Sequence, residues 1–163
     1  MPFEFDDKTG VIRDKLTGER CIVLTQARMQ DIFSRLAAIF QSGATVIAFE
    51  AGKAAGKRFV EEVPREAKAD NPTFFNTITQ RFTDAGLGKI ELEEFNPEKA
   101  EVTLRIWNNF FADLGSEKDM YRSCIEGFVC AVYEQVMSIT PKIKKTKCIT
   151  NGDLYCEWHI TPL

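Results

Sequence analysis

The sequence predicts an α+β fold in which helices pack on an antiparallel sheet. Segments with apolar residues at helical spacing are followed by segments of strand-like alternation, in the order strand, three helices, hairpin, long helix, hairpin. Turn-forming residues at Asn96–Lys99 and Asn151-Gly152 separate the paired strands. No internal repeat or low-complexity linker interrupts the 163 residues, so we expect residues 1–163 to form one domain.

The first half of the chain is expected to be helical after a short strand at residues 19–24. Thr25 suits the N-cap of a helix whose apolar stripe runs to Phe40, and a second helix covers residues 45–63. Small residues recur on one face of the second helix at steps of four: Ala48, Gly52 and Gly56. Because glycine is unfavourable inside a helix, this face indicates close packing. Another helix, a partner subunit or a bound ligand would each explain it.

The second half is expected to contain two helices and two hairpins. Asn71-Pro72 supplies an N-cap and a first-turn proline for the third helix, and Ser116 with Asp119 resembles the capping box of the last helix, which Pro141 ends. The expected strands are residues 89–95 with 100–107, and residues 142–150 with 154–160.

Composition excludes several classes of function. A net charge of −3 and a pI near 5.3 argue against nucleic-acid binding, and the basic run Lys142–Lys147 is expected to be the solvated face of a strand. No apolar run approaches the roughly 20 residues that cross a bilayer, and the N-terminus lacks the features of a signal peptide. We therefore expect a cytoplasmic protein without a membrane span. The 13 phenylalanines require a large core or an apolar cavity.

Five cysteines, an odd number, are more typical of free thiols in a reducing compartment than of a disulfide scaffold. Cys21 and Cys130 lie in apolar surroundings and are expected to be buried small hydrophobes. Cys148 and Cys156 instead flank the Asn151-Gly152 turn, and Cys124 lies on the helix before them. These three thiols are the candidates for a metal or redox site.

The cysteine pattern resembles the C-terminal signature of the 4-vinyl reductase domain family. Its parts are Cys124-Ile125-Glu126-Gly127-Phe128, the long helix, Cys148, Asn151-Gly152-Asp153 and Cys156. The earlier landmarks agree in order: the glycines of the second helix, Gly86-Leu87-Gly88-Lys89, and the hairpin ending in Trp107-Asn108-Asn109. The family is similar in fold to the small TRAPP subunits and to the sensor domains of aromatic-responsive activators, a fold of ligand-binding domains in NO signalling and Golgi transport.

The resemblance implies helices on a four-stranded antiparallel sheet, an apolar pocket and a homodimer. It does not imply reductase activity, and no glycine-rich nucleotide-binding loop follows an expected strand. The resemblance to the aromatic-responsive sensors also implies a zinc site. Its ligands would be the cysteines that match Cys124, Cys148 and Cys156, together with a glutamate at the position where this chain has Lys145. Zinc is therefore a possible cofactor whose fourth ligand would have to be water or another donor, such as Glu126 or His159.

The hairpin register decides whether Cys148 and Cys156 share a face. A two-residue loop would place them on opposite faces, in agreement with the polar residues that alternate with Cys148, whereas a three-residue loop would place them together. The family signature favours a shared face, and a β-bulge would allow it. His159, three residues after Cys156 on the same strand, is expected to point away.

Three functions remain open. The leading hypothesis is a non-enzymatic domain that binds a small apolar or aromatic molecule, although aromatic stripes are more often core. The candidate ligand-binding residues are Trp107, Phe110, Phe111, Tyr121 and Phe128. The alternative is a homodimeric assembly module of the TRAPP-subunit type. The third is a thiol enzyme or redox protein, which would need Lys145 or Lys147 to lower a thiol pKa.

Overall fold

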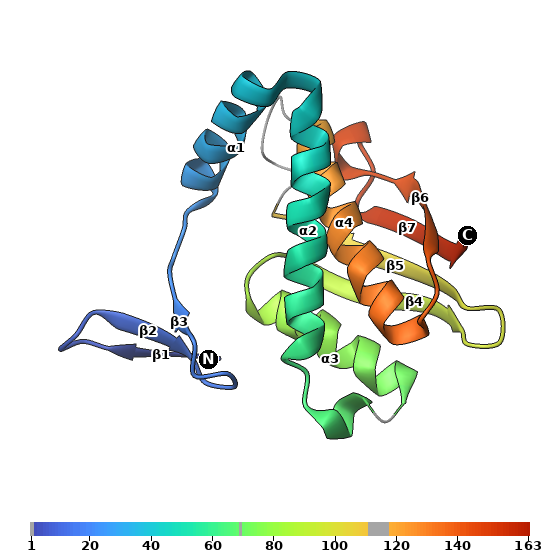
Figure 1. Ribbon diagram of the computed structural model, residues 1–163, viewed down its shortest axis with the longest axis horizontal. Helices are drawn as coiled ribbons and strands as arrows, with labels where there is room; N and C mark the ends of the chain where they lie inside the picture. Colours follow the sequence, from blue (N-terminus) through green and yellow to red (C-terminus); the bar gives the residue numbers. More distant parts are fainter. Residues whose placement is uncertain (1, 69, 111–117) are drawn as a thin grey trace.

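A computed structural model describes residues 2–68, 70–110 and 118–163, and its centre is a four-stranded antiparallel sheet covered by helices on one face (Figure 1). The strand order is β4-β5-β7-β6. The strands are β4 (Lys89–Asn96), β5 (Glu101–Trp107), β6 (Pro141–Lys147) and β7 (Cys156–Pro162). The predicted α+β class and the two C-terminal hairpins are therefore confirmed.

The four α-helices follow the predicted order. They are α1 (Gln26–Phe40), α2 (Ala44–Glu61), α3 (Asn71–Asp84) and α4 (Lys118–Met137). Thr25 caps α1 as predicted, because its side chain accepts a hydrogen bond from the backbone N–H of Arg28. The predicted cap of α3 was wrong by one residue, since Asp70, not Asn71, accepts the N–H of Thr73 at 2.9 Å. The predicted capping residue Ser116 lies outside the described residues.

Helices α2 and α4 pack with their backbones in contact. A side chain at Gly52 would collide with the backbone carbonyl of Cys124, and one at Gly127 would collide with the carbonyl of Phe49. A Cβ at Gly56 would lie 2.5 Å from the carbonyl oxygen of Phe128. Of the three explanations open for the small-residue face of α2, packing against another helix is the one observed.

The core lies between the sheet and the α3–α4 layer. Alternate residues of β5 point inward, and those of β7 do the same, so that each strand presents one buried face. The inward residues of these two strands are Val102, Leu104, Ile106, Cys156, Trp158 and Ile160. Four apolar residues of α3 and the sheet-facing side of α4 cover them. Six of the 13 phenylalanines belong to this core or pack against its margin.

The N-terminus forms a second, three-stranded antiparallel sheet that the sequence analysis missed. Its strands are β1 (Phe3–Asp6), β2 (Val11–Asp14) and β3 (Arg20–Cys21), and only β3 overlaps the expected strand at residues 19–24. The Asp6–Gly10 turn could have revealed it, since Asp6 accepts hydrogen bonds from Lys8 and Thr9 and Gly10 has φ +68°. Figure 1 shows this sheet to one side of the main body.

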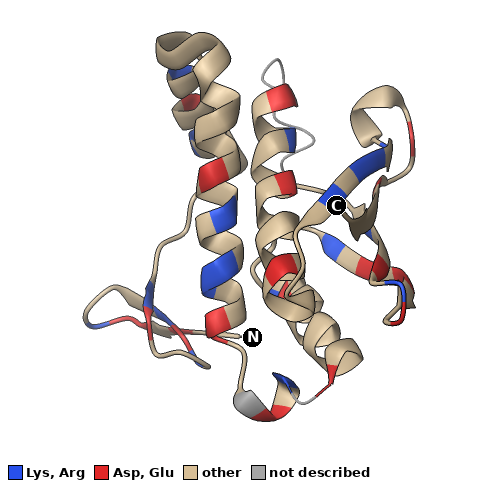
Figure 2. Ribbon diagram, turned by 45° about the vertical axis from the view of Figure 1, so that its right-hand side comes forward, with Lys and Arg blue, Asp and Glu red and all other residues tan. Residues whose placement is uncertain are grey.

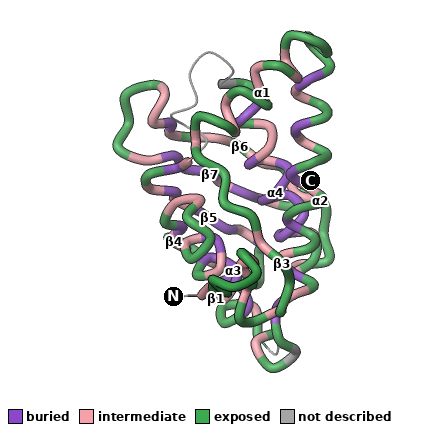
Figure 3. Tube along the Cα trace, turned by 90° about the vertical axis from the view of Figure 1, so that its left-hand side faces the viewer, coloured by how far each residue is buried: buried purple, intermediate pink, exposed green. Residues whose placement is uncertain are grey.

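Helix α1 lies at the edge of the fold with no fully buried residue. By length and composition alone, the helical run Gln26–Glu61 could cross a membrane, which corrects the expectation that no apolar segment is long enough. The 3-10 turn Gln41–Gly43 divides this run, and α1 and α2 fold back on each other as a helical hairpin (Figure 1). Figure 3 shows that exposed residues dominate the N-terminal segments, whereas burial concentrates in α4 and the sheet.

Candidate functional site

A cavity of about 160 Å³ lies between the N-terminal half of α4 and the β6–β7 hairpin. Helix α4 contributes Tyr121, Arg122 and Ile125 to its lining. The β6–β7 hairpin contributes Lys145, Cys148, Cys156 and Trp158. Asn109, Asp119, Thr150 and Asn151 complete the lining, and the exposure of Asp119 and Asn151 means that the cavity reaches the surface there.

A β-bulge in β6 turns Cys148 into this cavity. Lys145 pairs with Trp158 and Lys147 pairs with Glu157, so two residues of β6, Thr146 and Lys147, oppose one residue of β7. Regular alternation would place Lys145 and Cys148 on opposite faces, and the extra residue places both on the inner face. The chain then turns through the 3-10 segment Ile149–Asn151. The two thiols therefore share a face, as the family signature favoured, although neither a two-residue nor a three-residue loop joins the strands.

The sulfur atoms of Cys148 and Cys156 are 3.9 Å apart, and both residues are buried. The Thr150 hydroxyl lies 2.8 Å from the Cys148 sulfur, and the backbone N–H of Cys148 donates to Asp153 at 2.8 Å. The side-chain amide of Asn109 lies 4.0 Å from the Cys156 sulfur. The side chains of Thr150 and Asp153 in this turn thus fix the position of Cys148, and Asn109, just after β5, lies near the sulfur of Cys156.

The two thiols differ in their electrostatic surroundings. Burial acts to raise the pKa of Cys148, but hydrogen bonds from Lys145 and Thr150 and the positive charge of Lys145 outweigh it, so the pKa is lowered. Burial raises the pKa of Cys156, and a negative charge on Cys148 raises it further. Of the two thiols, Cys148 is therefore the one that ionises more readily.

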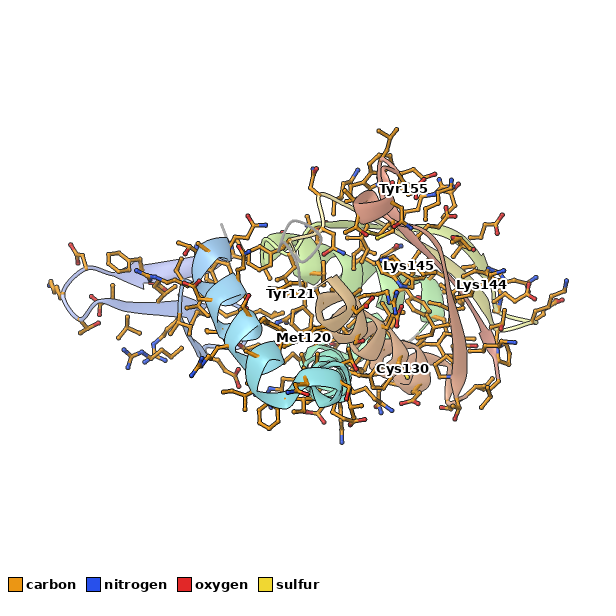
Figure 4. The ribbon with its side chains drawn as sticks, turned by 90° about the horizontal axis from the view of Figure 1, so that it is seen from above. Met120, Tyr121, Cys130, Lys144, Lys145 and Tyr155 are labelled. Carbon is orange, nitrogen blue, oxygen red and sulfur yellow. The ribbon has the colours of Figure 1, made fainter. Side chains whose placement is uncertain are left out.

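Lys145 is one of the two cationic side chains that line the cavity, the other being Arg122. Its ammonium nitrogen lies 5.2 Å from the centre of the Trp158 ring, on the inner side of β6, whereas Lys144 lies farther out (Figure 4). Burial raises the pKa of Glu126 on α4, and the charges of Arg122 and Lys145 oppose that rise. Figure 2 shows the basic residues along β6, and the expectation that all of them form a solvated face is wrong at Lys145.

The third candidate thiol, Cys124, does not join the other two. It packs beside Ala44, Ala48 and Met120 on the α2-facing side of α4, where burial raises its pKa to about 11. Within residues 2–68, 70–110 and 118–163, no three His, Cys, Asp or Glu side chains lie close enough together to hold a metal ion. The donor set implied by the resemblance is therefore not assembled, and we assign no zinc chemistry to this cavity.

The possible fourth zinc ligands do not complete that set either. His159 lies on the outer face of the sheet, where its Nδ1 is 3.2 Å from the Thr103 hydroxyl, as the strand spacing predicted. Glu126 lies close enough to Arg122 and Lys145 for their positive charges to act on its pKa.

Cys130, expected to be a buried hydrophobe, is buried and lies 3.5 Å from a Glu134 oxygen. Its pKa is raised to about 11, chiefly by burial.

The five aromatic candidates occupy different places. Tyr121 lines the cavity, and its ring packs 5.0 Å from that of Phe33 on α1. Phe128 lies in the core against Phe59 and Phe82. Trp107 faces the outer side of the sheet, and Phe110 follows it with a backbone N–H that donates to the carbonyl of Leu87. Phe111 lies outside the described residues.

Several cavity residues were not singled out from the sequence. Asn109, Ile125, Thr150 and Trp158 all lie on its wall. Trp158 shares the inward face of Cys156, and Ile125 follows Cys124 in the cysteine signature, so the cysteine pattern could have pointed to both of them. Asn109 stands in the Trp107-Asn108-Asn109 landmark and Thr150 precedes the Asn151-Gly152 turn, but periodicity does not point either of them to the cavity, because each is brought there by a turn after a strand.

Comparison with solved structures identifies the fold. The chain is similar to the phenol-responsive sensory domain of the transcription activator PoxR with phenol, with a TM-score of 0.77, 16% identity and coverage of 99% of this chain and 85% of that one. It is also similar to subunit 3 of a trafficking protein particle complex from Naegleria fowleri covalently bound to palmitic acid, with a TM-score of 0.61 at 13% identity over 85% of this chain and 95% of that one.

A third similar structure is a vinyl-4-reductase family protein from Methanocaldococcus jannaschii, with a TM-score of 0.56 at 14% identity over 88% of this chain and 84% of that one. No protein-family model and no curated protein matches the sequence. At these identities the likeness establishes the fold. The predicted kinship in fold with TRAPP subunits and aromatic-responsive sensors is thereby confirmed, while membership of the 4-vinyl reductase family stays a prediction.

Proposed function

We propose that this chain is a non-enzymatic domain that binds a small aromatic molecule in the cavity between α4 and the β6–β7 hairpin. The observation that carries the proposal is the composition of the cavity wall. Tyr121, Ile125 and Trp158 supply aromatic and aliphatic surface, while six of the eleven lining residues are polar or charged, among them Asn109 and Lys145. Because apolar surface in a pocket gives affinity and polar groups fix orientation, this mixed wall suits a small ring that carries a polar group.

The volume limits the ligand to about one ring. An apolar cavity of about 150 Å³ is large enough to bind benzene, and this cavity measures about 160 Å³. Lys145 and Asn109 can bind a hydroxyl or another oxygen on that ring. A monocyclic phenol therefore fits better than a long hydrocarbon or a tetrapyrrole. The phenol in the PoxR sensory domain, which has the same fold, supports this class of ligand.

Thermal unfolding with a panel of phenol, cresols, catechol and benzene tests the proposal. A ligand at a concentration of roughly 100 times its Kd stabilises the folded state by about 2.7 kcal/mol. For a domain of this size that corresponds to a rise in Tm of roughly 5–10 °C. We expect phenols to exceed benzene, because benzene cannot use Lys145 or Asn109.

Blocked variants make the test specific to this cavity. Ile125→Trp fills it from α4 and Thr150→Trp fills it from the hairpin, and either change should abolish the shift in Tm. Leu154→Trp is the matched control, because Leu154 is 82% exposed and lies outside the cavity lining. An equal shift in the blocked variants and the control would refute this site. If no compound of the panel shifts the wild-type Tm, the proposed ligand class is wrong.

A second candidate function, self-assembly, is favoured by the surface of the helical hairpin. Five large apolar residues of α1 and α2 are exposed in the single chain: Ile32, Ile39, Phe40, Val46 and Ile47. Such a surface is typical of a protein or membrane contact. A second copy of this chain is the partner that we propose for it, with α1 as the centre of the interface.

Light scattering of the purified protein distinguishes the two states. We expect a dimer that Ile39→Glu or Val46→Glu converts to monomer, while Leu16→Glu, a change at an exposed residue of the N-terminal sheet region, leaves it a dimer. A wild-type protein that is monomeric at high micromolar concentration would refute self-assembly. Ligand binding in the cavity would be unaffected by that result, so the two functions are separately testable.

A further inference from the structure

We propose that Cys148 and Cys156 are a site of reversible oxidation, at which a hydroperoxide converts the two thiols into an intramolecular disulfide. This proposal concerns the thiols alone and holds whether or not the cavity binds an aromatic molecule. It assigns a chemical role to the pair of side chains that the bulge in β6 brings together.

The geometry of the strands suits a disulfide. Lys147 and Glu157 are the last paired residues of the hairpin, and Cys148 and Cys156 are the residues that follow them toward the turn. Continued in the same register, the two cysteines would have Cα atoms about 4.5–5.5 Å apart, inside the range of about 4.4–6.8 Å found in disulfides. The sulfur atoms are 3.9 Å apart and have to approach to about 2.05 Å to form the bond.

The surroundings select Cys148 as the thiol that reacts first. Thiolates, rather than thiols, attack oxidants, and a nearby cation stabilises the thiolate. Lys145 and the Thr150 hydroxyl both contact Cys148, whereas Cys156 lies deeper, with the Asn109 amide and the Cys148 sulfur as its polar neighbours. Cys148 is thus the nucleophile and Cys156 the resolving thiol.

A small oxidant can reach the pair. Both sulfur-bearing residues line the cavity of about 160 Å³, whose rim includes the exposed residues Asp119 and Asn151. A water molecule occupies about 30 Å³ of liquid volume, so a molecule the size of hydrogen peroxide can fit beside Cys148. Cys124 and Cys130 do not line this cavity.

The chemistry balances with hydrogen peroxide as the oxidant. The Cys148 thiolate attacks one peroxide oxygen; an S–O bond forms, the O–O bond breaks, and the departing hydroxide takes a proton to become water. The Cys156 sulfur then attacks the sulfenic sulfur of Cys148; the S–S bond forms, the S–O bond breaks, and the hydroxide leaves as water with the Cys156 proton. Two thiols lose two electrons in total, and one peroxide becomes two waters.

Mass spectrometry of the full chain after a short hydrogen peroxide treatment tests the proposal. Chelator is present throughout, so that no adventitious metal occupies the thiols. The expected product is a monomer lighter by two hydrogen atoms, whose digest contains a peptide pair joined through Cys148 and Cys156 and whose mass is restored by dithiothreitol. Oxidised protein without that joined pair, or with a disulfide involving Cys21, Cys124 or Cys130 in its place, overturns the proposal.

Single variants test the order of the steps. With Cys156→Ser, a sulfenic acid should accumulate at Cys148 and be trapped by dimedone; with Cys148→Ser, Cys156 should remain unlabelled. Cys124→Ser is the control and should form the disulfide at the wild-type rate. Equal labelling of Cys148 and Cys156 in the two variants would overturn the assignment of the nucleophile. Circular dichroism confirms that each variant is folded before it is scored.

Lys145→Met and Lys144→Met form a matched pair for the role of the cation. Both changes remove one positive charge from β6, but only Lys145 lines the cavity. We expect Lys145→Met to slow disulfide formation roughly tenfold, the effect of about one pKa unit on the thiolate fraction, and Lys144→Met to leave the rate unchanged. An equal effect of both variants would show that general surface charge, and not the contact at Cys148, controls the reaction.

Discussion

Gly52→Ala is predicted to destabilise the protein, although alanine is the better helix former. The change relieves the cost of a glycine inside a helix and gains about 0.5–1 kcal/mol on that account. Against this gain, the new methyl group meets the backbone carbonyl of Cys124, which has no rotamer by which to move away. Overpacking of this kind costs typically about 1–3 kcal/mol. The net loss in the free energy of unfolding is therefore expected to lie between about 0 and 2.5 kcal/mol, toward the upper end because the methyl group meets backbone.

Denaturant unfolding followed by far-UV circular dichroism measures this loss, and Gly43→Ala is the matched control. Gly43 precedes the same helix with φ −72°, and no atom lies within 4 Å of the position that its Cβ would take. We expect Gly43→Ala to be neutral or to stabilise by a few tenths up to about 1 kcal/mol. If Gly52→Ala is as stable as Gly43→Ala, the two helices are not in backbone contact and the account of the small-residue face fails.

The reciprocal change gives a second measurement of the same crossing. Gly127→Ala places a methyl group against the Phe49 carbonyl of α2 and should cost as much as Gly52→Ala. Once one methyl group has moved the helices apart, the second meets more space. The double variant should therefore lose less stability than the sum of the single variants, with a coupling of about 0.5 kcal/mol or more. Strict additivity would indicate that the two glycines face different neighbours.

Three further predictions concern the fold around the site. Asp70→Ala should destabilise α3 by about 1 kcal/mol in denaturant unfolding, whereas Asn71→Ala should cost less, because Asp70 is the residue that caps the helix; the reverse order would restore the cap expected from the sequence. Tyr133→Phe should cost about 1–3 kcal/mol, because it leaves the buried Ala100 carbonyl without the Tyr133 hydroxyl that donates to it at 2.6 Å, and an unchanged midpoint would refute this bond. The hydrogen bond from Arg105 lowers the pKa of Glu157 in the folded protein. The ionised Glu157 carboxylate therefore stabilises the fold above its unfolded pKa of about 4.3, and this stabilisation is lost as pH falls through the lower folded pKa. Glu157→Gln should flatten the stability profile below about pH 5, and Glu98→Gln, in an exposed turn, should leave it unchanged.

Much of the fold was predictable because local periodicity and burial agree. The stripe of α3, the alternation of β5 and the small-residue face of α2 each follow from one repeating pattern, and each has the partner that the pattern requires. The N-terminal sheet was missed because its strands have four, four and two residues, too short for alternation to be distinguished from a loop. The turn residues between them carried the better signal.

The site was less predictable than the fold. Cys148 and Cys156 were found from the sequence, but the cavity joins them to Asn109 and Trp158 across three strands, and no single segment encodes that meeting. Cys124 was expected beside them because it belongs to the same signature. Its position on α4 is instead governed by the α2 contact, since the glycine-lined crossing orients that side of the helix toward α2.

The bulge in β6 links the register of the hairpin to the charge of the site. Without it, Lys145 and Cys148 would lie on opposite faces of the strand, and the ammonium group of Lys145 could not stabilise a thiolate at Cys148. With it, one ammonium faces two thiols, which is enough to balance one thiolate and not two. A zinc ion would ionise every thiol that it bound, whereas a single lysine favours ionisation of one thiol of the pair. That asymmetry suits stepwise oxidation, since Cys148 reacts with the peroxide first and Cys156 loses its proton only when its sulfur attacks the sulfenic sulfur of Cys148.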